Sequence, residues 1–138
     1  MKTNWSGRNI VILGAARQGV SLARYMAAQS AVVTLNDVRP VEQMQSAQEA
    51  LQGLPIRWEL GGHPLSILDG ADLLCISGGV PLTNPLVIEA ERRGLPISND
   101  SQIFMEAVNC PVVGITGSAG KTTTTTLVGR MARYGVTP

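Results

Sequence analysis

The sequence predicts an α/β fold, in which a Rossmann-like, doubly wound parallel sheet of about five strands precedes the opening part of a second α/β domain. Short apolar runs alternate along the chain with segments of helical period. Glycine-rich loops follow several of these runs, as expected where a strand turns into a helix. The chain has 138 residues, 44% of them hydrophobic, which is enough for a sizeable packed core.

The first half of the chain predicts three strands separated by two helices. Apolar side chains at the 3–4 spacing of one helix face, namely Val20, Ala23 and Ala27, support the first helix. Gly53 is expected to stop the second helix. In order, these elements are a strand at 9–13, a helix at 18–29, a strand at 31–35 that continues into Asn36 and Asp37, a helix at 41–51 and a strand at 56–60.

The clearest helix boundaries lie further along the chain. Asn84 is a good N-cap, Pro85 fits the first turn, and Gly94 can adopt the left-handed conformation that ends a helix. Arg92 and Arg93 would occupy the last turn, where cations interact favourably with the helix dipole. The elements predicted around this helix are a strand at 73–76, a short strand at 95–97, and a helix that Asp100 caps and that runs through 108.

Two domains are predicted, a first domain at 1–109 and the start of a second at 110–138. The second opens with a strand at 112–116, followed by a glycine loop and a helix from Lys121 to about Arg133. No further strand follows in the sequence, so this α/β unit is expected to be truncated. Its helix begins with five consecutive threonines, which are poor helix formers and need packing or a ligand to stabilise them.

Charge and hydropathy exclude several classes of protein. The net charge is +1, and no basic run indicates a nucleic-acid partner or a charged membrane surface. The N-terminal segment lacks the apolar core of a signal peptide, and no apolar run approaches the roughly 18 residues of a membrane span. Cys75 and Cys110 lie in apolar stretches and are interpreted as buried thiols in a reducing compartment. We therefore expect a soluble, cytoplasmic protein.

The strongest motif for chemistry is Gly117-Ser118-Ala119-Gly120-Lys121-Thr122-Thr123, between the strand and the helix predicted for the second unit. Glycines allow successive backbone N–H groups to point into one concavity, and the helix N-terminus adds positive potential. Lys121 would reach the outer phosphates of a nucleotide, and the Thr122 hydroxyl would bind Mg²⁺. The loop is shorter than a strict P-loop, because Ile115 occupies the position of the first glycine. The alternative is a glycine turn that merely precedes Lys-Thr.

A second glycine motif, Gly14-Ala15-Ala16-Arg17-Gln18-Gly19, directly follows the first predicted strand. It keeps the first and third glycines of the dinucleotide fingerprint but has Ala16 in place of the second, where the backbone must approach a diphosphate closely. If the loop binds a nucleotide, Arg17 and Gln18 would lie at the diphosphate and contact it through the N–H groups of the helix N-terminus. A plain tight turn between strand and helix is the alternative.

Asp37 and Arg39 lie at the end of the second predicted strand. An acidic residue about 20 positions after the first glycine commonly contacts a ribose or a base edge. The planar cation of Arg39 could stack on a heterocycle. A solvated ion pair at a strand end is the alternative.

A third loop, Ser77-Gly78-Gly79-Val80-Pro81, follows the fourth predicted strand. In an open parallel sheet, ligands bind beyond the carboxyl ends of the strands, where the chain winding reverses. Gly14, Asp37 and Ser77 would all fall on that edge, so a binding site is expected there, although the loop could be merely flexible. The only histidine, His63, lies between Gly-Gly and proline and is interpreted as a loop residue.

Together these residues resemble the Mur ligases of peptidoglycan synthesis. The likeness runs over the whole chain in order, but Ala16, Gly78 and Ala119 replace the glycine, proline and asparagine that are usual in the family. Residues 114–123 are similar to the family's ATP loop, and Asp37-Val38-Arg39 is similar to its D-x-R uracil-binding element. Ser77-Gly78-Gly79-Val80 is similar to its phosphate loop, and residues 99–104 are similar to the segment that closes its first domain.

The resemblance implies an enzyme that uses ATP and Mg²⁺ to join D-glutamate to UDP-N-acetylmuramoyl-L-alanine in cell-wall biogenesis, because the D-x-R element favours the D-glutamate-adding branch. The family's other catalytic groups, including a modified lysine, lie past Pro138, so this chain is expected to bind the UDP part but to be inactive alone. By resemblance, Lys121 would be catalytic and Thr122 would bind the metal. The residues that would bind ATP are Gly117, Ser118, Ala119, Gly120, Lys121, Thr122 and Thr123. By the same resemblance, UDP would be bound by Arg17, Gln18, Asp37, Arg39, Ser77, Gly78 and Gly79.

Two alternative functions remain at the level of sequence. An NAD(P)-binding oxidoreductase domain would account for the first glycine loop and for Asp37. Ala16 and the second phosphate loop at Gly117 count against it, since a dehydrogenase needs no such loop. A regulatory or scaffolding protein that kept the fold without catalysis is the other alternative.

Overall fold

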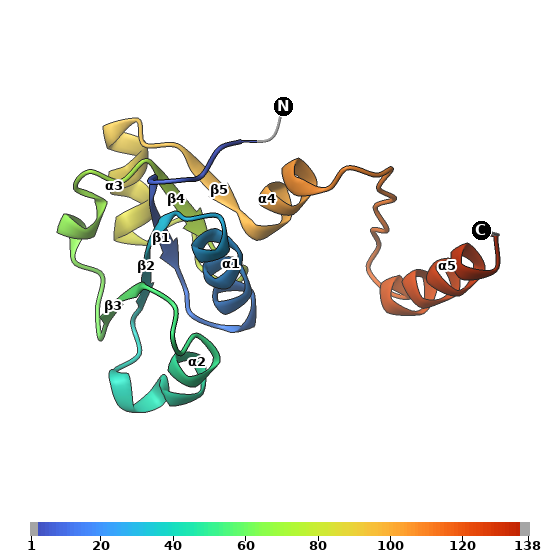
Figure 1. The fold of residues 1–138 in the computed structure, drawn as a ribbon, viewed down its shortest axis with the longest axis horizontal. Coiled ribbons are helices and arrows are strands. Elements are labelled where there is room, and N and C mark those ends of the chain that lie inside the picture. The colour runs from blue at the N-terminus through green and yellow to red at the C-terminus, as the bar shows by residue number, and fades with distance from the viewer. Residues whose placement is uncertain (1–2, 136–138) are drawn as a thin grey trace. The chain divides into compact units, whose positions relative to one another are not determined.

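The computed structural model describes residues 3–135. The chain divides into two compact units, Met1–Val108 and Asn109–Pro138, and each is described by itself (Figure 1). All strands found in the described residues belong to the first unit, whereas the regular structure of the second is a single helix.

A five-stranded parallel sheet forms the centre of the first unit, with its strands in the order β3-β2-β1-β4-β5 (Figure 1). The winding reverses at β1, because β2 and β3 lie on one side of it and β4 and β5 on the other. The predicted fold class is therefore confirmed. The strands are β1 (Asn9–Leu13), β2 (Val32–Asp37), β3 (Ile56–Leu60), β4 (Leu73–Ile76) and β5 (Ile97–Asn99).

Helices cover both faces of this sheet, as crossover connections between parallel strands require. α1 and α2 pack against one face, whereas α3 and the short helix η2 pack against the other. The helical segments of the first unit are α1 (Arg17–Ala28), η1 (Val41–Gln43), α2 (Gln45–Ala50), η2 (Leu65–Leu68), α3 (Pro85–Arg93) and α4 (Asp100–Ala107).

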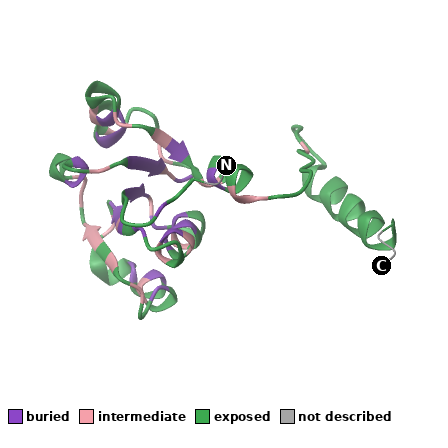
Figure 2. Cartoon of the chain, turned by 45° about the horizontal axis from the view of Figure 1, so that its top comes forward, coloured by how far each residue is buried: buried purple, intermediate pink, exposed green. Residues whose placement is uncertain are grey.

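The central strand β1 contributes to the core on both of its faces. Ile10 and Ile12 belong to the cluster under α1, and Val11 and Leu13 belong to the cluster under α3. All four are at most 2% exposed, and Figure 2 shows buried segments on the sheet and on the inner sides of the helices. Each such side chain contributes about 1.5–3 kcal/mol by burial, so β1 holds the two layers together.

The ends of α3 form as the sequence predicts. The Asn84 side-chain oxygen accepts a hydrogen bond from the backbone N–H of Leu86 at 2.9 Å, and Pro85 occupies the first turn. Gly94 ends the helix in the left-handed conformation, with a φ of +66°.

Two predicted boundaries near the end of the first unit are wrong. β5 begins at Ile97 rather than at Leu95, because the Leu95 N–H donates to the Ala90 carbonyl and thereby belongs to the final turn of α3. Asn99, rather than Asp100, caps α4, because its extended backbone directs its side-chain oxygen to the N–H of Gln102 at 2.9 Å.

The helix predicted at 41–51 is interrupted in the middle. Its start is the 3₁₀ turn η1, in which the Met44 N–H donates to the Val41 carbonyl at 3.0 Å. The Met44 side chain is almost completely buried. The chain then continues as α2, which is only six residues long.

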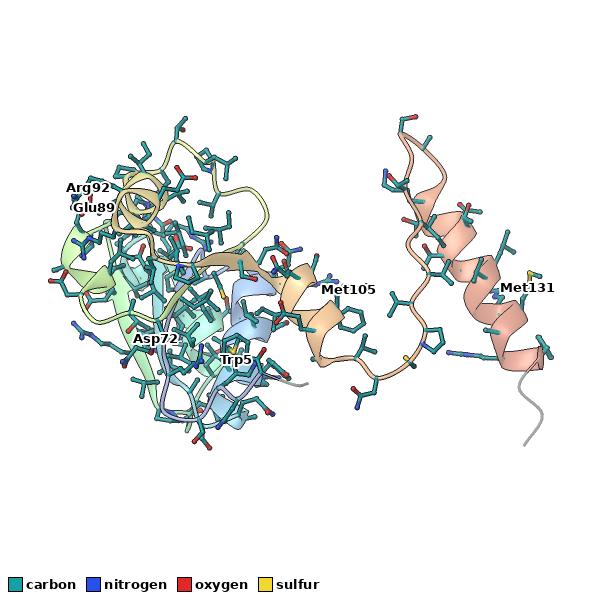
Figure 3. All side chains as sticks on the ribbon, turned by 90° about the horizontal axis from the view of Figure 1, so that it is seen from above. Trp5, Asp72, Glu89, Arg92, Met105 and Met131 are labelled. Carbon is teal, nitrogen blue, oxygen red and sulfur yellow. The ribbon has the colours of Figure 1, made fainter. Side chains whose placement is uncertain are left out.

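The second unit contains α5 (Lys121–Gly135) and no strand among its described residues. The strand predicted at 112–116 is not formed, because an apolar run becomes a strand only when a neighbour pairs with its backbone N–H and C=O groups. No described residue from 109 to 135 is buried, and Figure 2 shows α5 as exposed. Ile115 is the one described residue of this range that is half-buried. Met131, labelled on α5 in Figure 3, is 72% exposed.

The two cysteines lie in different environments. Cys75 in β4 is completely buried, and burial raises the pKa of its thiol to about 12. Cys110 is exposed, so the prediction that both thiols are buried is wrong for Cys110, which lies in the second unit, where none of the described residues is buried. No helix within residues 3–135 has the length and hydrophobicity needed to cross a membrane.

Candidate functional site

The loops that follow β1, β2 and β4 are joined by direct hydrogen bonds at the carboxyl edge of the sheet. The Ala15 N–H donates to the Asp37 carboxylate at 2.7 Å, and the Gly14 N–H donates to the Asn36 carbonyl at 2.8 Å. The Ser77 hydroxyl donates to the Gly14 carbonyl at 2.9 Å. The sequence-predicted residues Gly14, Asp37 and Ser77 therefore meet at one place, where β1 marks the reversal of the winding.

The two outer glycines of the first loop are required by geometry. Gly14 has a φ of +96°, which an L side chain rarely adopts. A Cβ on Gly19 would lie 1.8 Å from the Gly14 carbonyl oxygen, so α1 packs directly against the end of β1 at this position. Ala16 occupies the N-cap of α1 without a side-chain hydrogen bond, so it provides no acceptor for the first N–H groups of the helix.

Asp37 uses both carboxylate oxygens within the protein. One accepts from the N–H of Arg39 at 3.0 Å and from its Nε at 2.8 Å. The other accepts from the N–H of Ala15 at 2.7 Å and from Arg39 Nη2 at 2.8 Å. The Arg39 guanidinium, hydrogen-bonded to the carboxylate, holds the pKa of Asp37 well below its usual value despite the opposing effect of burial.

The ion pair that the sequence left as an alternative is thus present, but it is not fully solvated. The Asp37 side chain is 8% exposed and that of Arg39 is 41% exposed. Asp37 therefore holds the first glycine loop and orients Arg39, whose guanidinium keeps an open face.

Arg39 borders a hollow of about 360 Å³ between the first glycine loop and α2. Arg17, the first residue of α1, lies on the same hollow, so two guanidiniums and a helix N-terminus surround it. Such an arrangement favours an anionic ligand with a planar part. The other lining residues are Ala15, Ala16, Val20, Ser21, Gln43, Met44, Ser46, Ala47 and Ala50.

The loop after β4 is fastened to the first glycine loop. Beyond the Ser77 hydroxyl bond, the Gly78 N–H donates to Gln18 Oε1 at 3.2 Å. A Cβ on Gly78 would lie 2.7 Å from that oxygen, and Gly79 has a φ of +94°. Gln18, predicted to face a diphosphate, thus also ties the two loops together, and the small residues Gly78 and Gly79 are exposed.

Two residues at this edge were missed as a pair by the sequence analysis. Asn36 is completely buried in β2, and its Oδ1 lies 2.6 Å from Nδ1 of His63. His63 is a loop residue, as predicted, in the segment between β3 and η2. The available signal was an amide residue directly before Asp37, at the end of a mostly apolar strand.

The second glycine loop, in the second unit, is a turn that leads directly into α5. Gly117 and Gly120 have φ values of +151° and +77°, and α5 begins immediately afterwards at Lys121. The Lys121 ammonium donates back to the Gly117 carbonyl across the loop. The three loop residues, Ser118, Ala119 and Gly120, are exposed, as are Thr122 and Thr123.

The threonine run at the start of α5 is stabilised within the helix itself. The hydroxyls of Thr125 and Thr126 donate to the carbonyls of Lys121 and Thr122 at 2.8 and 2.9 Å. Such bonds one turn back satisfy the hydroxyls of β-branched residues that are otherwise poor helix formers.

The comparison with protein families agrees with this geometry. Residues 8–99 match the family model described as Mur ligase MurD-like, N-terminal domain, a range that contains β1 to β5 and the three joined loops. The chain belongs to the MurD-like Mur ligase family. Among its relatives, the UDP-N-acetylmuramoylalanine–D-glutamate ligase of Enterococcus faecalis is 42% identical over 128 residues, which are 92% of this chain.

Other members of the Mur ligases extend the comparison. The UDP-N-acetylmuramoylalanine–D-glutamate ligase of a Geobacillus species is 41% identical over 93% of this chain. The solved structure of UDP-N-acetylmuramate:L-alanyl-gamma-D-glutamyl-meso-diaminopimelate ligase from Neisseria meningitides covers 94% of this chain with 25% identity and a TM-score of 0.64. This chain spans 28% of the length of the two curated relatives and 40% of that solved chain.

Proposed function

We propose that this MurD-like chain is the nucleotide-binding part of an ATP-dependent ligase that adds D-glutamate to UDP-N-acetylmuramoyl-L-alanine in peptidoglycan synthesis. The observation that supports it most directly is the joining of the loops after β1, β2 and β4 by the bonds of Ala15 and Ser77 at the reversal of the sheet. The names of the curated relatives supply the substrate and the reaction.

The first unit would bind the UDP moiety. The open face of Arg39 would pack on the pyrimidine or donate to its carbonyl oxygens, while Asp37 holds that guanidinium in place. Arg17, at the N-terminus of α1, would attract the diphosphate. Gln18 and residues 77–79 would complete the diphosphate side, where exposed glycines allow close approach of a ligand.

The second unit would bind ATP and Mg²⁺. The left-handed φ values of Gly117 and Gly120, the exposure of the loop and the 15-residue helix behind it fit a phosphate group. Lys121 would exchange its bond to the Gly117 carbonyl for the outer phosphates, and Thr122 would offer its hydroxyl to the metal. When bound, ATP and Mg²⁺ supply the phosphoryl group and the charge neutralisation that activate a carboxylate.

Calorimetric titration of the chain with UDP, and in parallel with NADH, tests the proposal. We expect UDP to bind and NADH to bind more weakly or not at all; preferential binding of NADH would instead favour an oxidoreductase domain. Arg39→Ala should weaken UDP binding about tenfold, the effect of losing one or two charged contacts. The matched control is Arg57→Ala, which removes the same charge from the exposed amino-terminal half of β3.

The chain by itself should neither ligate D-glutamate nor hydrolyse ATP, because it spans 28% of the length of its curated relatives. Release of inorganic phosphate from ATP, measured with and without both substrates, checks this expectation. Turnover above the buffer blank would contradict it. We further propose the cytoplasm as its compartment, in keeping with two cysteines that form no disulfide.

A further inference from the structure

Asn36 and His63 form a hydrogen-bonded pair next to the ion pair of Asp37 and Arg39. Asn36 is completely buried in β2. Its side-chain Nδ2 donates to the carbonyls of Glu59 at 2.7 Å and Gly62 at 2.8 Å. Its Oδ1 lies 2.6 Å from Nδ1 of His63.

These contacts determine which nitrogen of His63 carries the proton. The two carbonyl oxygens can only accept, so both N–H groups of the Asn36 amide are committed to them. The Asn36 Oδ1 can also only accept, so the hydrogen between it and His63 belongs to the imidazole. The neutral ring therefore carries its proton on Nδ1 and leaves Nε2 without one.

The loop that carries His63 also supports the backbone of Arg39. The Gly61 N–H is shared between the carbonyls of Asp37 and Arg39, both at 3.0 Å. The next two residues of this loop, Gly62 and His63, are bonded to the Asn36 side chain. The Asn36 amide thus fixes the 61–63 segment, and that segment contacts the main chain from which the Arg39 guanidinium extends.

We infer that His63 and Asn36 are positioning residues of the uridine site, through an Nδ1–H···Oδ1 bond that fixes the 61–63 segment against the backbone of Arg39. This inference rests on the proposed function, since it assigns Arg39 to the pyrimidine. His63 itself need not touch the nucleotide. Its effect on binding would depend on the position of one donor atom rather than on the imidazole ring.

The tautomer of His63 can be read directly by NMR. His63 is the only histidine of the chain, so a long-range ¹H–¹⁵N spectrum of the imidazole ring contains a single set of signals. At a pH where the ring is neutral, we expect a protonated Nδ1 and an unprotonated Nε2. The opposite tautomer, which free histidine prefers, would overturn the inference, because the bond to Asn36 could not then form.

A pair of amide substitutions tests the position of the donor. The side-chain nitrogen of asparagine falls near the place of Nδ1, whereas that of glutamine falls near the place of Nε2. We expect His63→Asn to keep the UDP affinity of the wild-type chain to within about twofold. His63→Gln and His63→Ala should weaken it about tenfold, the cost of one lost hydrogen bond that orders a site.

Thermal unfolding, followed by the fluorescence of Trp5 and Trp58, separates positioning from folding. We expect His63→Gln to unfold at a lower temperature than His63→Asn, because it leaves the buried Asn36 Oδ1 without a donor. UDP affinity is therefore compared well below the unfolding temperature of every variant, where all of the chains are folded. If His63→Gln and His63→Ala bind UDP as tightly as the wild-type chain under these conditions, or if His63→Asn binds as weakly as they do, the inference is overturned and the proposed function stands. Failure of the wild-type chain to bind UDP would overturn both.

Discussion

Each unit of this chain contains a segment predicted as a strand, a glycine loop and a helix, and comparison of Gly14–Gly19 with Gly117–Gly120 shows different structural results. In the first unit, β1 is paired on both sides, and the loop from Gly14 to Gly19 is bonded to the strand ends of β2 and β4. In the second unit, the segment at 112–116 is unpaired, and the described bonds of the loop are internal to it and α5.

The difference separates what a glycine loop determines by itself from what neighbouring strands must supply. The positive φ of Gly117 and Gly120 and the start of α5 form without a sheet. Fixation of the loop in the first unit depends on acceptors from other strands, such as the Asp37 carboxylate for the Ala15 N–H. A nucleotide site needs both components.

The largest effect is expected from Gly19→Ala. Its Cβ would lie 1.8 Å from the Gly14 carbonyl oxygen, so α1 or the loop must shift, at a cost of more than about 3 kcal/mol in the free energy of unfolding. Urea unfolding and UDP titration measure this. The matched control is Gly129→Ala in α5, where a Cβ meets nothing within 4 Å. A similar loss of unfolding free energy in both variants would show that the close approach of Gly19 to the Gly14 carbonyl does not limit the side chain at that position.

A smaller loss is expected from Asp37→Asn, because the neutral amide keeps the shape but cannot accept all four bonds made by the carboxylate. We expect about 2 kcal/mol less stability at pH 7, the value of a charge-assisted hydrogen bond. Since the pKa of Asp37 is lower in the folded than in the unfolded chain, its contribution is complete above about pH 5 and is lost as the pH falls further.

The pH dependence supplies the control for this variant. The difference in unfolding free energy between wild type and Asp37→Asn should be constant from pH 7 down to about pH 5 and then shrink in more acidic buffer. Urea unfolding at a series of pH values measures it. A difference that grows on acidification would contradict the assigned direction.

Ser77→Ala should have a milder effect. It removes the single hydroxyl bond to the Gly14 carbonyl, with an expected cost of about 1 kcal/mol and a several-fold loss of UDP affinity. Ser66→Ala, at an exposed position of η2, is the control that should change neither quantity. Equal effects of the two substitutions would mean that the bond between the loops contributes nothing measurable.

The smallest effect is expected from deleting residues 109–138. Both tryptophans, Trp5 and Trp58, lie in the first unit, so their fluorescence follows its unfolding alone. Because that unit has its own core on both faces of the sheet, its unfolding temperature should change by no more than about 2 °C. A loss of cooperative unfolding would show that the second unit is needed for the first to fold.

The sequence predicts β1, β3 and β4 with their observed bounds, because β1 and β4 are apolar runs and β3 alternates apolar with charged residues, each between turn residues. The sequence does not predict where β5 begins, because Leu95 is as apolar as Ile97 but its N–H is hydrogen-bonded to the final turn of α3. The meeting of Gly14, Asp37 and Ser77 follows from parallel topology alone. The Asn36–His63 bond does not, since it depends on the register that places Asn36 beside Glu59.

The different exposure of the two cysteines has a practical use. Cys75 is inaccessible and has a pKa of about 12, whereas Cys110 is exposed at the beginning of the second unit. A maleimide dye should therefore attach to the unaltered chain at a single known position. Energy transfer from the tryptophans to such a dye would report any change in the distance between the first unit and Cys110 when nucleotides are added, without any engineered cysteine.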